Sequence, residues 1–137
     1  MQISELGEFA LIDRLTKDVK LHHGSTVKGI GDDCAIVDTT QSAGRALLTS
    51  DLLLEGIHFD LVYTPMQHLG YKAAMVNISD VYAMGGTPRQ MLVSVAVDRR
   101  ITVEALDDFY AGLRLACERH HVDIVGGDTS STLTGMV

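Results

Sequence analysis

The sequence predicts an α+β domain in which helices cover a mostly mixed β-sheet. Three observations support this fold class. Apolar residues recur at helical spacing in three segments, short apolar runs bounded by turn residues lie among them, and helix-capping residues stand where the helical patterns begin. Because 137 residues can bury one core, we expect a single domain over residues 1–137.

The N-terminal part of the chain predicts a helix followed by a hairpin. Residues 5–17 place apolar side chains at helical spacing after Ser4, which is a suitable N-cap. The apolar runs at 30–38 and 45–51 flank the turn-forming sequence TTQSAG. We therefore expect two paired strands there.

The longest helical pattern covers residues 66–84. Thr64 is the expected N-cap, Pro65 fits the first helical position, and Gly85 follows the last apolar residue, Met84. Apolar residues extend most of the way round this helix, so we expect it to be buried on more than one side.

A strand, a helix and a second strand complete the pattern. MLVSVAVD follows Pro88 as a strand, and Thr102 can cap a helix. VDIVGGD predicts a short strand that ends in a glycine turn. The helix after Thr102 carries an apolar stripe made of Leu106, Phe109, Tyr110, Leu113, Ala116 and Cys117. The final GMV begins another strand, so we expect the chain to be a fragment or an isolated domain.

The charge and the apolar runs of the chain argue against several classes of function. A net charge of -7 argues against a nucleic-acid or anionic-membrane surface. No apolar run approaches the roughly 18 residues of a membrane span, and the N-terminus lacks the basic region of a signal peptide. Cys34 and Cys117 lie far apart in apolar contexts, so we expect reduced core thiols in a cytoplasmic protein.

In four segments an apolar stretch is followed by an aspartate at or near a turn. If these carboxylates lie close together, a cation is needed to offset their repulsion. Two like charges about 4 Å apart repel by roughly 4 kcal/mol at an effective dielectric near 20. Magnesium reverses that sign and prefers oxygen ligands, including phosphate. The segments are GIGDDC with Asp32 and Asp33, LLTSD with Asp51 preceded by Thr49 and Ser50, NISD with Asp80, and IVGGD with Asp128.

Asp80 supports the metal hypothesis most strongly. An aspartate at a loop is usually a turn former or a cap, but Asp80 lies within a largely apolar helix where aspartate is unfavourable. Asn77 shares its face. A buried polar pair needs partners, so we expect metal or ligand contact there.

The remaining polar signals are weaker. VGGDTSS allows close approach of a phosphate to the backbone but is not a P-loop, because no GK[ST] follows. His58, seven residues after Asp51, is as compatible with a structural role as with substrate contact. Lys72 could contact phosphate or extend along its helix to solvent, and the sequence does not decide between them.

Five motifs together resemble the N-terminal domain of the thiamine-monophosphate kinase family, which shares a superfamily with aminoimidazole ribonucleotide synthetase and selenophosphate synthetase. In order, the motifs are GEFALIDRL, GIGDDCAIV, TSDLLLEGIHF, YKAAMVNISDVYAMGG and VGGDTS. The resemblance implies the aminoimidazole ribonucleotide synthetase-like fold. It also implies Mg²⁺-dependent phosphorylation of thiamine monophosphate by ATP.

The resemblance also implies roles for individual residues. Metal ligands would be Asp33, Thr49, Ser50, Asp51, Asp80 and Asp128, around several Mg²⁺ ions. Tyr110, Gly127 and Asp128 correspond to ATP contacts, and His58 corresponds to a substrate contact. TSD stands where many relatives have TTD, which keeps a hydroxyl. We expect direct in-line transfer without a covalent nucleophile, since the acceptor phosphate is already ionised at pH 7.

The family further implies a homodimer through this domain and a C-terminal domain that this chain lacks, so we expect the isolated fragment to be inactive. Two alternatives stay open. One is another ATP-dependent enzyme of the same superfamily, and the other is a non-catalytic module for metal binding or dimerisation.

Overall fold

The computed structural model describes residues 9–10, 18, 22–39 and 44–137. The chain divides into two compact units, Met1–Leu48 and Thr49–Val137, and each is considered by itself. Among the described residues, no helix has the length and apolarity needed to cross a membrane.

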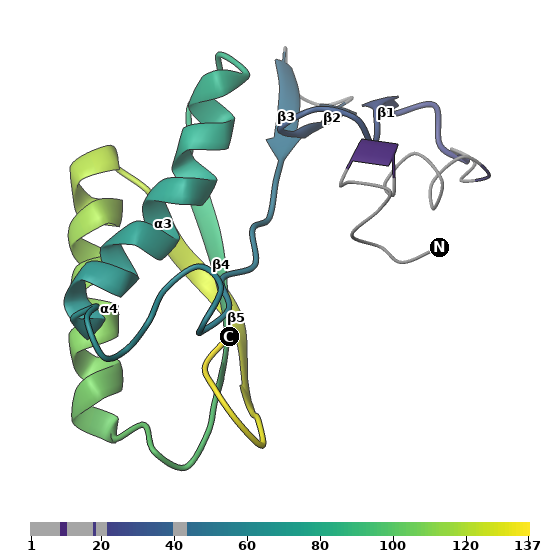
Figure 1. Ribbon diagram of the computed structural model, residues 1–137. Coiled ribbons are helices and arrows are strands. Elements are labelled where there is room, and N and C mark those ends of the chain that lie inside the picture. Colours follow the sequence, from purple (N-terminus) through teal and green to yellow (C-terminus); the bar gives the residue numbers. More distant parts are fainter. Residues whose placement is uncertain (1–8, 11–17, 19–21, 40–43) are drawn as a thin grey trace. The chain divides into compact units, whose positions relative to one another are not determined.

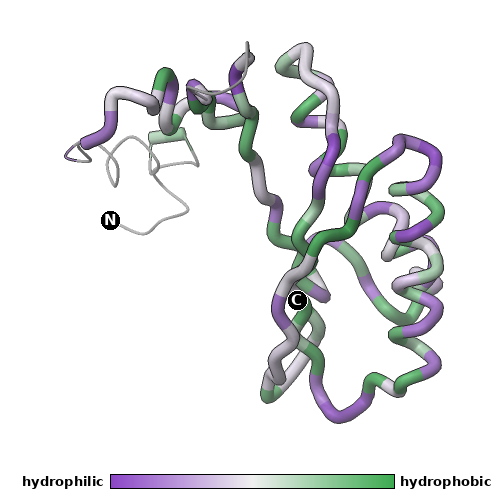
Figure 2. The backbone as a smooth tube through the Cα atoms, turned by 180° about the vertical axis from the view of Figure 1, so that it is seen from behind, coloured by the Kyte–Doolittle hydropathy of each residue, from purple (hydrophilic) through white to green (hydrophobic). Residues whose placement is uncertain are grey.

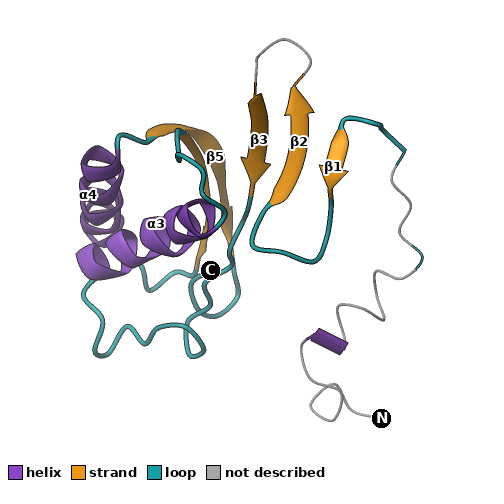
Figure 3. Cartoon of the chain, turned by 90° about the horizontal axis from the view of Figure 1, so that it is seen from above, coloured by secondary structure: helices purple, strands orange, loops and turns teal. Residues whose placement is uncertain are grey.

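The first unit contains a three-stranded antiparallel sheet. Its strands are β1 (Thr26–Lys28), β2 (Ala35–Thr39) and β3 (Gly44–Leu48), in the order β1-β2-β3 (Figure 3). The register of β2 with β3 runs from Ala35 opposite Leu48 to Thr39 opposite Gly44, which confirms the predicted hairpin. Residues 40–43 of its turn, and most of the helix predicted at 5–17, lie outside the described residues; Phe9 and Ala10 are helical.

The second unit is built from two helices packed on a parallel strand pair. Helix α3 (Met66–Ala83) precedes β4 (Gln90–Val97), which is followed by α4 (Val103–His120) and β5 (Asp123–Ser131). Strands β4 and β5 pair in parallel through the α4 crossover. Both helices lie on one side of this pair (Figure 1). The α+β fold class is confirmed, with antiparallel and parallel strands in separate sheets.

The core lies between the helices and the inward face of β4. Leu69, Ile78 and Leu113 are almost completely buried. The stripe predicted on α4 is confirmed, because Phe109, Leu113, Ala116 and Cys117 are buried while Leu106 and Tyr110 pack against them. Figure 2 shows hydrophilic and hydrophobic segments alternating along α4. Cys34, in the first unit, is also buried.

The helix start predicted for α3 was wrong by one position. Pro65 is the N-cap residue, and no side chain caps this end. The backbone N–H of Thr64 instead donates to the carbonyl oxygen of Asp60 at 2.8 Å, within a turn that ends before the helix. Thr102, in contrast, caps α4 as predicted, since its hydroxyl accepts from the Ala105 N–H at 3.2 Å.

The predicted glycine turn at the end of the last strand was also wrong. Gly126 and Gly127 lie inside β5, opposite Leu92 and Val93 of β4. A Cβ atom on Gly127 would stand 1.8 Å from the Val93 carbonyl oxygen. The glycine is therefore needed for strand pairing, because only a residue without a side chain permits this approach.

Candidate functional site

Two hydrogen bonds attach the segment after β3 to the polar face of α3. The Thr49 hydroxyl donates to Oδ2 of Asp80 at 3.0 Å. The backbone N–H of Asp51 donates to Oδ1 of Asn77 at 2.9 Å, and the Asn77 amide donates to the Ala73 carbonyl at 3.1 Å. We call Thr49, Asp51, Asn77 and Asp80 the acidic cluster. The expected polar pair on α3 therefore has partners, and they come from the predicted TSD motif.

The acidic cluster holds two carboxylates that repel each other. Burial is the main cause that raises the pKa of Asp51, and the charge of Asp80 raises it further. The nearby His58 acts in the opposite direction. Within the described residues no lysine or arginine forms an ion pair with either carboxylate, so the cluster lacks cationic charge.

The donor set of the acidic cluster fits a hard divalent cation that is shared with a ligand. Carboxylate oxygens of Asp51 and Asp80 and the hydroxyl of Thr49 are the ligand types that Mg²⁺ takes. No three His, Cys, Asp or Glu side chains in the described ranges lie close enough to hold a metal ion together. Magnesium commonly uses one or two carboxylates together with substrate phosphates. The donor types therefore suit Mg²⁺ that arrives with a phosphate ligand.

His58 occupies a tight turn that follows Asp51. Its Nδ1 accepts from the Leu54 N–H at 2.9 Å, so in the neutral ring the proton lies on Nε2. The side chain is exposed, and Nε2 is available to donate to a ligand. Lys72 of α3 donates to the His58 carbonyl oxygen, which gives this lysine a role in holding the turn.

Among the described residues of the second unit, the other predicted site residues form no side-chain hydrogen bond or ion pair with the acidic cluster. Asp33 is exposed in the first unit, and its N–H donates to Oδ1 of Asp32 at 3.0 Å. Ser50 and Asp128 are exposed, with Asp128 opposite Ser94 in the β4–β5 register. Tyr110 is half-buried, and its ring meets that of Phe109 edge-on with centroids 5.6 Å apart. Their assignments, and that of Gly127, stay predictions.

Sequence reasoning did not identify two features of this region. Asn77 was expected, like Asp80, to contact a metal or a ligand, whereas its side-chain oxygen accepts from the backbone N–H of Asp51. Glu55, between Asp51 and His58, accepts from Arg100 at 3.0 Å and was not singled out. An isolated charge inside the apolar run LLLEGIHF was the signal that could have indicated it.

Comparison with known proteins establishes the class. A family model described as AIR synthase related protein, N-terminal domain, matches residues 31–137. The chain belongs to this family.

The individual relatives belong to a narrower group within this family. The chain is 39% identical to thiamine-monophosphate kinase of Bacillus subtilis over 132 residues, and 40% identical to that of Aquifex aeolicus. Each match covers 96% of this chain and 40% of the relative. The chain thus spans about two fifths of the length of the curated relatives it matches. The predicted resemblance is confirmed.

Solved structures of thiamine-monophosphate kinases are also similar to this chain. AaThiL complexed with AMPPCP and TMP matches with a TM-score of 0.85 and 38% identity, over 99% of this chain and 41% of that one. The crystal structure of thiamine monophosphate kinase from Aquifex aeolicus matches with a TM-score of 0.73 and 32% identity, with the same two coverages.

Proposed function

We propose that the protein containing this chain transfers the γ-phosphoryl group of ATP to thiamine monophosphate, giving thiamine diphosphate and ADP. The observation that carries this proposal is the similarity, over 99% of the chain, to a structure complexed with AMPPCP and TMP. AMPPCP is an ATP analogue. The acidic cluster supports the proposal independently, since its chemistry suits a cation that accompanies phosphates.

The predicted site residues have distinct roles in this proposal. Asp51 and Asp80, with Thr49 and Ser50, would hold Mg²⁺ and so orient the triphosphate. The family resemblance further implies Asp33 and Asp128 as carboxylate ligands. Asn77 holds the Asp51 backbone in place. When bound, Mg²⁺ neutralises charge on the phosphates. Tyr110 and Gly127 would contact the nucleotide, and His58 would donate from Nε2 to the substrate.

The transfer itself needs no protein nucleophile. An ionised phosphate oxygen of thiamine monophosphate forms the new bond to the γ-phosphorus, and the bond from that phosphorus to the β,γ-bridging oxygen breaks. The electron pair of the broken bond stays on ADP. Since the acceptor oxygen carries no proton at pH 7, the residues are required for positioning and charge compensation. Burial raises the pKa of the Cys117 thiol, which agrees with a core role.

We also infer that the domain forms a homodimer, as the family resemblance implies. The outward face of the β4–β5 pair supports this. Every residue of β5 is exposed, and so are the apolar side chains of Leu92 and Val125. Parallel strands are normally covered on both faces. A second copy on this face would provide that cover.

A second candidate is favoured by the family model, whose description refers to AIR synthase related proteins. Another ATP-dependent enzyme of the superfamily would use the same acidic cluster for Mg²⁺ and ATP. It would differ in the acceptor, and therefore in the contacts made around His58.

A substrate assay separates the candidates. The protein as its gene encodes it is incubated with ATP and Mg²⁺, together with either thiamine monophosphate or the precursor of aminoimidazole ribonucleotide. We expect equal amounts of thiamine diphosphate and ADP from the first and no reaction with the second. Turnover of the second alone would assign the other enzyme, and turnover of neither would indicate a non-catalytic module.

A further inference from the structure

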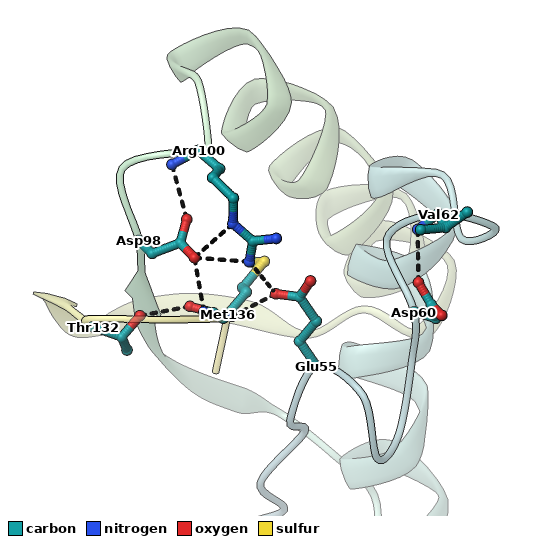
Figure 4. A network of polar contacts seen from close by, with 8 residues as sticks. Glu55, Asp60, Val62, Asp98, Arg100, Thr132 and Met136 are labelled. Atoms are coloured by element: carbon teal, nitrogen blue, oxygen red, sulfur yellow. Dashed lines mark hydrogen bonds and ion pairs between the residues drawn. The ribbon is translucent and has the colours of Figure 1, made fainter.

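A second charged network lies beside the turn that carries His58. Arg100 contacts two carboxylates through Nη2, Oδ2 of Asp98 at 2.7 Å and Oε2 of Glu55 at 3.0 Å (Figure 4). Its Nε also donates to Oδ2 of Asp98 at 2.8 Å. The Asp98 side chain is only 4% exposed. The backbone N–H of Arg100, which donates to Oδ1 of Asp98 at 2.8 Å, is the main cause that lowers the pKa of Asp98, and the Arg100 guanidinium lowers it further.

The same carboxylates bind the backbone of the last residues in the chain. Gly135 N–H donates to Oδ2 of Asp98 at 2.7 Å, and Met136 N–H donates to Oε2 of Glu55 at 3.0 Å. The Glu55 N–H donates in return to the Met136 carbonyl oxygen at 2.9 Å. Glu55 is thus joined to Met136 through both its backbone and its side chain.

This terminal segment is itself fixed to the sheet. Val137 and Ala96 of β4 exchange two backbone hydrogen bonds of 2.9 Å. Met136 is buried in the core. Glu55 is therefore connected, through Met136 and Val137, to strand β4 and the core of the second unit.

Glu55 occupies a distinctive position between two predicted site residues. It follows Asp51 by four residues and precedes His58 by three. Directly after it, Gly56 has a φ of 81° and His58 N–H donates to the Leu54 carbonyl at 2.9 Å, which closes the turn. Any displacement of Glu55 would therefore move His58 relative to Asp51.

We propose that Glu55 is a positioning residue that, through Arg100 and Asp98, fixes the turn presenting His58 to the phosphate acceptor. This inference rests on the proposed function. Asp51 lies at the donor end of the segment and His58 at the acceptor end, so the network sets the span between donor and acceptor groups. In-line transfer depends steeply on that span, because small misplacements of reacting groups lose much of the rate.

The test compares Glu55→Gln and Arg100→Gln with Glu118→Gln as a matched control. Glu118 is exposed on α4, and none of the side-chain hydrogen bonds or ion pairs in the described residues involves it. Glu55→Gln keeps the shape and an acceptor for the Met136 N–H but removes the ion pair. Arg100→Gln removes the same pair from a side chain that is 59% exposed, and it also removes the ion pair with Asp98.

Two measurements are made on the protein as its gene encodes it. The first is amide hydrogen exchange of residues 54–59, which needs no activity. We expect exchange there to be about tenfold faster in both network variants, whereas Glu118→Gln matches the wild type. The second is steady-state kinetics. We expect KM for thiamine monophosphate to rise by about fivefold to tenfold, with KM for ATP nearly unchanged.

The double variant completes the design. Because Arg100→Gln already removes the ion pair with Glu55, Glu55→Gln with Arg100→Gln should be no worse than Arg100→Gln alone. Unchanged exchange at residues 54–59 in both single variants would overturn the inference, whatever the kinetics show. A wild-type protein that is inactive on thiamine monophosphate, with exchange accelerated in the variants, would overturn the proposed function and leave the structural role of Glu55 established.

Discussion

At the scale of single residues, the charged form of Asp51 lowers the stability of the folded protein. The free energy of unfolding should therefore depend on pH. Its pKa is raised above 3.8 in the folded chain, first by burial and then by Asp80. Well below pH 3.8 the carboxyl is protonated in both folded and unfolded states, so burial of this group carries no charge penalty. As pH rises through the folded pKa, the folded state loses a proton at a cost, and stability decreases.

The variant Asp51→Asn removes this ionisation. We expect the free energy of unfolding of the metal-free variant to fall less than that of the wild type as pH increases from about 4 to 7. Urea unfolding followed by circular dichroism at each pH provides the measurement, with Glu118→Gln as the control. Parallel pH profiles for Asp51→Asn and the wild type would show that the pKa of Asp51 is not raised in the folded state.

At the scale of elements, the crossing of α3 and α4 depends on two glycines. A Cβ atom on Gly70 would stand 1.8 Å from the Phe109 carbonyl oxygen, and one on Gly112 would stand 1.7 Å from that of Gln67. The clashing atoms belong to the backbone of the partner helix, so an added Cβ atom can be accommodated only if the two helices move apart. We expect Gly70→Ala and Gly112→Ala each to destabilise the protein by about 3 kcal/mol.

Gly44→Ala is the matched control for those substitutions, because nothing lies within 4 Å of a Cβ built on Gly44. Its effect should stay within about 0.5 kcal/mol. Chemical denaturation of the three variants gives the comparison. Equal stability of Gly70→Ala and Gly44→Ala would mean that the helices do not cross this closely.

The two threonines before the helices provide a second prediction at this scale. The hydroxyl of Thr102 caps α4, whereas Thr64 lies one residue before the N-cap of α3. We expect Thr102→Ala to cost about 1 kcal/mol of stability and Thr64→Ala to cost less than about 0.5 kcal/mol. A larger loss from Thr64→Ala, measured by the same denaturation method, would restore the assignment made from sequence.

The contrast between these threonines shows how far local patterns determine structure. The stripe on α4 and the β2–β3 hairpin follow from periodicity and turn composition, and both were predicted. The helix start was misplaced because a local turn, in which the Thr64 N–H donates to the Asp60 carbonyl, holds the residues before Pro65, and the capping pattern of Thr64 and Pro65 does not distinguish this turn from a helix start. Likewise, a Gly-Gly pair resembles a turn unless the close approach of Val93 in β4 is known.

The candidate site was predictable to a similar extent. Aspartates of four segments were expected to converge around Mg²⁺, namely Asp33, Asp51, Asp80 and Asp128. The structure joins Thr49 to Asp80 and Asp51 to Asn77 of the same helix, whereas the roles of Asp33 and Asp128 stay predictions. The contact from Glu55 to Met136 spans 81 positions. No local pattern in the sequence could reveal a partner at that separation.

At the scale of the whole molecule, the outward face of the β4–β5 pair should form the homodimer interface. Leu92 on that face and Val103 at the start of α4 are both 71% exposed. We expect Leu92→Lys to convert the protein to a monomer, as measured by light scattering, because a charge buried in an apolar interface is costly. Val103→Lys should leave the dimer intact. A dimer that survives Leu92→Lys would place the interface elsewhere.

The most direct test of the proposed site is the thermal midpoint of the protein with and without Mg²⁺ and AMPPCP. We expect the ligands to raise the wild-type midpoint by several degrees, since they bind only the folded state. Without ligands, Asp51→Asn and Asp80→Asn should unfold at the wild-type midpoint or above it, and their ligand-dependent rise should be largely lost. A rise of equal size in wild type and both variants would contradict the assignment of these carboxylates to a magnesium–nucleotide site.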